Sequence, residues 1–71
     1  MDRKNAKQVV LGGIESITEL GRIFPKIKEN CDEDEYRSLQ FTVCGIIADI
    51  TDKLINPIYD QYPDLEAEID G

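Results

Sequence analysis

The sequence predicts an all-α protein in which two long helices form a helical hairpin and a short helix follows at the C-terminal end. Apolar residues recur at helical spacing over residues 1–30 and again over 33–55, an acidic loop at 31–34 separates the two runs, and Asn56-Pro57 marks a new helix start. A chain of 71 residues is long enough for one domain, so we expect a single helical domain over 1–71.

The first helix is predicted within residues 1–30, where apolar side chains follow one face. Asp2 or Asn5 can cap its first backbone N–H groups. Pro25 lacks a backbone donor and crowds the carbonyl four residues before it, so we expect a kink near Pro25, or a break with Pro25 opening a last short turn. Gly12 and Gly13 indicate either that the helix starts after them or that another backbone approaches closely there. Gly13 and Gly21 both face inward in this pattern, which favours close packing.

The second helix is predicted over 33–55, after a loop at 31–34. Asp32 followed by Glu35 has the spacing of a capping box, with aspartate in place of serine or threonine. The acidic residues of this segment also suit the positive end of a helix dipole. We expect the helix to stop at Asn56, because the residue before a proline avoids helical backbone angles.

The segment 57–71 is predicted as a short helix followed by an acidic tail. Asn56 suits a helix cap and Pro57 suits a first helical position. Pro63 interrupts this helix, and the residues after it alternate between acidic and apolar. They therefore form either a frayed helical turn or a disordered tail.

The second helix is apolar around more than half of its circumference. With Tyr36 as zero and about 100° per residue, its two apolar arcs together span roughly 220°, whereas an ordinary surface helix needs little more than 100°. The first arc consists of Tyr36, Leu39, Val43, Ile46, Ile47, Ile50 and Leu54. The second arc consists of Phe41, Cys44, Ala48 and Ile55. Because one preceding helix covers only one side, we expect a homodimer packed as a four-helix bundle.

The candidate interface residues come from the second arc and from the C-terminal segment. Large exposed apolar side chains usually mark interfaces, which singles out Phe41 and Ile55. Tyr59 and Tyr62 combine apolar area with a polar tip, as residues at binding hot spots do, although packing as a lid under the end of the hairpin is the favoured alternative. The candidate interface is thus Phe41, Cys44, Ala48, Ile55, Tyr59 and Tyr62.

The sequence contains few residues of the types that catalyse reactions or bind metal ions. The chain has no histidine, and Cys31 and Cys44 are too few for a disulfide framework or a structural zinc site, so two reduced thiols are favoured over a single bridge. The acidic run that begins at Asp32 does not match an EF-hand, whose sixth and twelfth positions would here be Arg37 and Val43. We therefore expect no enzyme activity, no cofactor and no metal site.

Charge and hydropathy narrow the classes of partner. The net charge of −7 divides into +2 over residues 1–30 and −9 over residues 31–71. An acidic surface repels phosphate backbones, so we expect no nucleic-acid partner, whereas a basic protein surface is attracted. No segment has the length of a signal peptide or of a membrane span, which predicts a cytoplasmic protein without a membrane partner.

These observations together predict a non-enzymatic protein–protein interaction module. It would be a small acidic regulator, adaptor or inhibitor that docks on a basic protein surface. The alternative is a purely structural, self-assembling helical subunit, in which both apolar arcs are covered by other copies and the charge maintains solubility.

Overall fold

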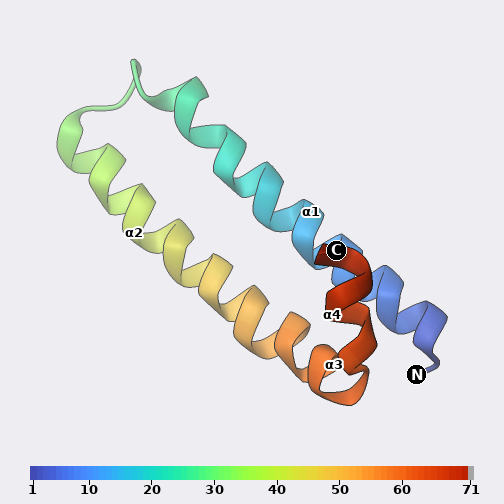
Figure 1. The fold of residues 1–71 in the computed structure, drawn as a ribbon. Coiled ribbons are helices and arrows are strands. Elements are labelled where there is room, and N and C mark those ends of the chain that lie inside the picture. Colours follow the sequence, from blue (N-terminus) through green and yellow to red (C-terminus); the bar gives the residue numbers. More distant parts are fainter. Residues whose placement is uncertain (71) are drawn as a thin grey trace.

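A computed structural model describes residues 1–70, and all of its secondary structure is helical. Two long helices lie antiparallel as a hairpin, and the C-terminal helices turn back over the N-terminal part of the first (Figure 1). The molecule is elongated, with extents of 45 × 19 × 17 Å. The predicted all-α hairpin is therefore confirmed, while the four-helix bundle, which needs a second chain, stays a prediction.

Helix α1 spans Arg3–Ile27 and begins where the sequence predicts. The Asp2 carboxylate accepts a hydrogen bond from the backbone N–H of Asn5 at 2.8 Å, which caps the helix. Pro25 lies inside α1, and the helix continues through it to Ile27. The predicted break at Pro25 does not occur, and a turn at 28–30 follows instead.

Helix α2 spans Glu33–Asp49, and Asp32 caps it as predicted. The Asp32 carboxylate accepts from the backbone N–H of Glu35 at 2.8 Å. This hydrogen bond is the main cause that lowers the pKa of Asp32, whereas the side-chain hydrogen bond to Asp32 raises the pKa of Glu35. At the same end of the hairpin the rings of Phe24 and Tyr36 meet edge to face, with centroids 5.7 Å apart.

After α2 the helix widens into a π-helical segment, η1, over Ile50–Ile55. The backbone N–H of Asn56 bonds to the carbonyl of Thr51, five residues before it, and Asn56 itself has helical angles of φ −62° and ψ −40°. The predicted stop at Asn56 is therefore wrong. In a regular α-helix the Pro57 ring would crowd the carbonyl of Lys53, and the wider π turn lies where this crowding would occur.

The π-helical segment also changes which side chains face α1. A π turn holds more residues than an α turn, so residues after it fall further back around the helix than 100° per residue predicts. Ile55, predicted on the uncovered second arc, is only 5% exposed. Leu54, predicted on the covered first arc, is 40% exposed. The placement of Ile55 on an open surface is thus corrected, because η1 turns it toward α1.

Gly13 is the residue of α1 that receives Ile55, and it is buried. A Cβ atom at this position would lie 3.2 Å from Ile55 Cγ1 and 3.4 Å from Leu54 Cδ2. The absence of a side chain therefore allows the close approach predicted at Gly13. The predicted inward position of Gly21 is wrong, because Gly21 is exposed and a Cβ there would meet no neighbour within 4 Å.

Two short helices complete the chain: α3 over Asn56–Gln61 and α4 over Pro63–Asp70. Tyr62 separates them with φ −131° and ψ 74°, outside the helical region that a residue before proline avoids. The predicted frayed turn or disordered tail is instead a docked helix, and Leu65 in it is 0% exposed. Leu65 and Ile69 are four residues apart, so they share one helix face, which packs on the core. Gly71 lies outside the described residues.

The core sits at one end of the hairpin, where the N-terminal part of α1 meets η1, α3 and α4. Its buried members are Ala6, Val10, Ile55, Ile58 and Leu65. Within α2, Val43 is the buried residue. Toward the loop the two long helices therefore cover one another along a narrow seam, which leaves much of α2 facing solvent.

Candidate protein-interaction surface

Helix α2 contacts α1 through a seam and carries exposed apolar side chains on both sides of it. The seam runs from Tyr36, against Phe24, through the buried Val43, toward Ile55 against Gly13. On one side lies the Leu39 strip, which consists of Leu39, Ile46 and Leu54. On the other side lies the Phe41 strip, which consists of Phe41, Cys44, Gly45 and Ala48.

The Leu39 strip is a line of aliphatic side chains along the helix. Leu39, Ile46 and Leu54 are 38%, 45% and 40% exposed. The first two are seven residues apart and share a face of α2, and the wider η1 turn brings Leu54 back toward the same line. Glu35 is four residues before Leu39 and Asp49 is three residues after Ile46, so carboxylates border the strip.

The Phe41 strip combines one large ring with small neighbours. The Phe41 side chain is 85% exposed, the largest value among the exposed large apolar residues of the described chain. Cys44, Gly45 and Ala48 follow three, four and seven residues later on the same face and are also exposed. No atom lies within 4 Å of the point where a Cβ at Gly45 would sit. The helix therefore presents one bulky side chain beside small, exposed neighbours.

The predicted interface residues separate into two groups in the structure. Phe41, Cys44 and Ala48 lie together and exposed on α2, whereas Ile55 is buried against α1. Tyr59 and Tyr62 are half-buried and pack against the core, in agreement with the lid alternative. The two groups therefore do not form one surface.

The two tyrosines differ in their polar surroundings. The Tyr62 hydroxyl donates a hydrogen bond to the Met1 carbonyl, which ties the break between α3 and α4 to the start of the chain. Burial raises the pKa of Tyr59, and the nearby carboxylates of Asp70 and Glu66 add to this effect. Both environments suit a structural role at the end of the hairpin.

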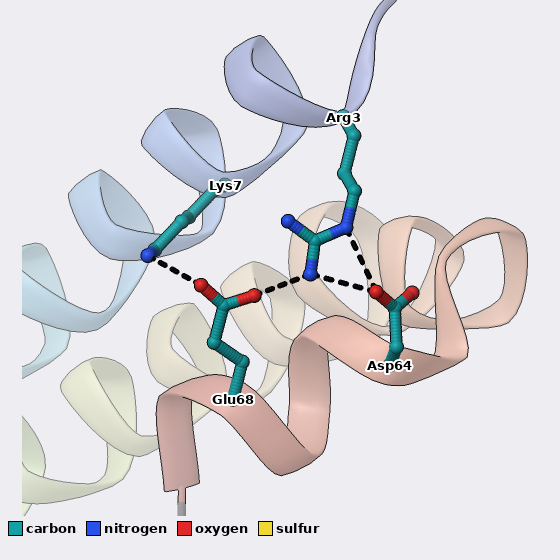
Figure 2. Close-up of polar contacts among 4 residues, drawn as sticks. All are labelled: Arg3, Lys7, Asp64 and Glu68. Atoms are coloured by element: carbon teal, nitrogen blue, oxygen red, sulfur yellow. Dashed lines mark hydrogen bonds and ion pairs between the residues drawn. The ribbon is translucent and has the colours of Figure 1, made fainter.

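Sequence reasoning missed a polar cluster that holds α4 on α1 (Figure 2). Arg3 Nε donates to Asp64 Oδ2 at 2.8 Å, the Arg3 guanidinium also bonds to Glu68, and Lys7 Nζ lies 2.7 Å from Glu68 Oε1. The two bases are four residues apart on α1, and the two acids are four residues apart on α4. This matched spacing is the signal that could have paired the two helices.

Sequence reasoning also missed the Leu39 strip, because Leu39, Ile46 and Leu54 were all assigned to the covered arc. The hairpin contact is narrower than a full arc, since one helix packs against α2 along a single line of side chains. The sequence signal for this strip was that the second helix is apolar on more sides than one neighbouring helix covers.

We also searched residues 1–70 for metal sites, disulfides and membrane-spanning helices. Within residues 1–70 no group of three or more histidine, cysteine, aspartate or glutamate side chains is placed to hold a metal ion. Cys31 and Cys44 are both free thiols. None of the helices over this range has the length and apolar character needed to cross a membrane. Comparisons of the chain with known protein families, with curated proteins and with solved structures give no match.

Proposed function

We propose that this chain is a small non-enzymatic protein–protein interaction module whose Leu39 strip docks on a basic surface of another protein. The observation that carries the proposal is the alignment of three exposed aliphatic side chains along one helix, bordered by carboxylates. Single exposed apolar residues are ordinary on a protein surface, whereas an aligned apolar patch with a polar border is typical of a contact surface.

In this proposal the Leu39 strip provides binding affinity, and the surrounding negative charge selects a basic partner. The aliphatic side chains supply affinity when they leave water, at about 25 cal/mol per Å² of buried apolar area. The carboxylates of Glu35 and Asp49, within a half of the chain that carries −9, favour a partner with basic residues around an apolar groove. Apolar anchors about two turns apart are the usual pattern of a helix bound in such a groove.

The experiment compares binding by the wild-type chain with binding by two variants of α2. Ile46→Glu places a charge in the middle of the Leu39 strip, and Ser38→Glu places the same charge on an exposed position outside both strips. We expect a purified basic partner, first isolated with the wild-type chain, to bind wild type and Ser38→Glu alike and to lose most of its affinity for Ile46→Glu.

Salt provides the second readout of the same experiment. Because salt screens exposed charges, calorimetric titrations should give a larger Kd at high than at low ionic strength. A partner that binds Ile46→Glu as tightly as wild type, or an affinity that is independent of salt, would refute the proposed docking mode.

A purely structural, self-assembling subunit is the second candidate. The observation in its favour is the Phe41 strip, where an exposed ring and small exposed residues lie side by side on one helix. If both strips are covered by other copies, Ile46→Glu will dissociate an oligomer of this chain instead of a complex with a basic protein.

A further inference from the structure

We infer that a second copy of this chain covers the Phe41 strip, with the two α2 helices packed antiparallel about a two-fold axis near Cys44 and Gly45. The contact uses the opposite side of the α1–α2 seam from the Leu39 strip. It therefore stands independently of the proposed docking on a basic partner.

The shape of the strip is complementary to itself. In an antiparallel pair centred between Cys44 and Gly45, Phe41 lies over Ala48 of the second copy, because the two residues are equally far from that centre. Cys44 then lies beside Gly45 of the second copy, where no atom occupies the space above the backbone. Each Phe41 ring thus packs on the small Ala48 side chain of the other chain, and the two contacts are equivalent, as an isologous two-fold interface requires.

Charge fixes the direction of packing. The same register places Arg37 opposite Asp52 of the second copy, and the wider η1 turn brings Asp52 back toward the Phe41 side of the helix. In the single chain the Arg37 guanidinium contacts Glu33 at 3.0 Å, but these side chains are 73% and 86% exposed, so the pair holds Arg37 weakly. A parallel pair would instead place Arg37 beside Arg37 and Phe41 against Phe41.

A second copy would also cover the apolar surface of α2 that the single chain leaves exposed. The buried core gathers at one end of the hairpin, whereas the middle of α2 is covered on one side only. A chain of this size buries about 60% of its unfolded surface by itself, and association is a common remedy. The assembly would hold four long helices, with the two α2 helices at its centre.

The first experiment measures molar mass by light scattering after size exclusion, over a range of protein concentration. We expect wild type to be a dimer, Phe41→Asp to be a folded monomer, and Leu39→Asp, which adds the same charge on the other side of α2, to remain a dimer. A wild-type monomer at all concentrations would overturn the inference. A dimer broken by Leu39→Asp but not by Phe41→Asp would overturn it as well, because self-association would then use the Leu39 strip.

Charge reversal tests the antiparallel register without touching the Phe41 ring, so it remains decisive if Phe41→Asp fails to fold. Arg37→Asp and Asp52→Arg should each weaken dimerisation about three- to tenfold, since each replaces attraction by repulsion at two symmetric positions. The double variant should recover wild-type affinity. Failure of this rescue, with both single variants folded, would refute the register.

Oxidation gives an independent measure of the distance across the axis. Cys44 is exposed, and the proposed axis brings the two Cys44 residues close to the separation that a disulfide spans. The Cys31→Ala variant should form disulfide-linked dimers on mild oxidation, whereas Cys44→Ala, which keeps Cys31, should not. Linkage through Cys31 alone would contradict the proposed interface.

Discussion

At the scale of single residues, the decisive contact is the one between Gly13 and Ile55. Neither residue carries chemistry, yet the missing side chain of one lets the other approach α1 closely. The glycine pair in α1 shows how local context decides a role: Gly12 has nothing within 4 Å of a Cβ position, whereas Gly13 faces Ile55 and Leu54. A side chain would thus meet open space at position 12 and tight contacts at position 13.

This contrast yields a prediction for two matched variants. Gly12→Ala should raise the free energy of unfolding by about 0.5–1 kcal/mol, because alanine in a helix interior loses less backbone entropy than glycine. Gly13→Ala should gain less or lose stability, because its Cβ would meet Ile55 Cγ1 at 3.2 Å. Urea denaturation monitored by circular dichroism measures both. Equal gains would show that Ile55 has room to move away.

At the scale of elements, α4 and η1 determine the end of the hairpin that holds the core. Helix α4 is attached by one buried side chain, Leu65, and by the ion pairs of Arg3 and Lys7 with Asp64 and Glu68. The π turn of η1 carries the chain through a proline without a break and turns Ile55 inward. Both elements bring residues distant in the chain together: Ile55 with Gly13, and Leu65 with Val10 in the core.

The ion pairs predict how the docking of α4 depends on pH. Hydrogen bonds from Lys7 and then from Arg3 lower the pKa of Glu68 from 4.5 to about 2. Because the folded-state pKa lies below the unfolded one, the stabilisation is complete above about pH 4.5 and is lost as the pH falls toward 2. Thermal unfolding of wild type and of Glu68→Gln should therefore converge over this range.

Glu66→Gln is the matched control, since it removes a carboxylate from the same helix outside the ion-pair cluster. It should keep the wild-type dependence on pH between 4.5 and 2. If Glu68→Gln shows the same acid dependence as wild type, the pairs with Lys7 and Arg3 do not stabilise the docked helix.

The π turn predicts how the protein tolerates the deletion of one residue in η1. Deletion of the exposed Lys53 should convert η1 into an α-helix while Ile55 keeps its orientation, because a π turn corresponds to one extra residue in an α-helix. The regained α geometry would crowd the Pro57 ring, at a cost of about 3 kcal/mol. The deletion should therefore be much better tolerated in a Pro57→Ala chain than in the wild-type chain.

Deletion of Gln8, an exposed residue of α1, is the control for this experiment. Because α1 has no π turn to absorb the change, Ala6 would rotate away from the core, and the urea midpoint should fall strongly with either residue at position 57. Equal effects of the two deletions on the urea midpoint would refute the proposed role of η1.

At the scale of the whole molecule, the core lies off-centre in an elongated hairpin. The fully buried side chains gather where the two ends of the chain meet, and the loop half is held by a narrow seam and the edge-to-face pair of Phe24 and Tyr36. An association through α2 would bury apolar area where the single chain buries least. Global stability would then depend on the amount of dimer.

The corresponding prediction is that Tm rises with protein concentration. A folded dimer in equilibrium with unfolded chains is stabilised by mass action, whereas a monomer has a Tm that is independent of concentration. Calorimetry or circular dichroism over a wide concentration range measures this dependence. Phe41→Asp should abolish it and Leu39→Asp should retain it, so a constant Tm in wild type would contradict association through the Phe41 strip.

The sequence by itself determined the two long helices of the hairpin, the cap of α2 and the face that Phe41 shares with Cys44 and Ala48. Caps and apolar periodicity act over three or four residues, so Asp2, Asp32 and the face shared by Phe41, Cys44 and Ala48 follow from local spacing. The avoidance of helical angles before proline holds for Tyr62, which leaves the helix before Pro63, but not for Asn56, which stays helical before Pro57.

Only the tertiary structure decided the position of Ile55, the docking of α4 and the openness of the Leu39 strip. Each involves residues far apart in the chain: Ile55 packs against Gly13 of α1 after the π turn, and α4 docks because Arg3 and Lys7 meet its carboxylates. The Leu39 strip is open because one helix covers only a narrow line of another. Local periodicity gives the direction of a side chain around its helix axis, but neighbours distant in sequence decide whether that side chain is covered.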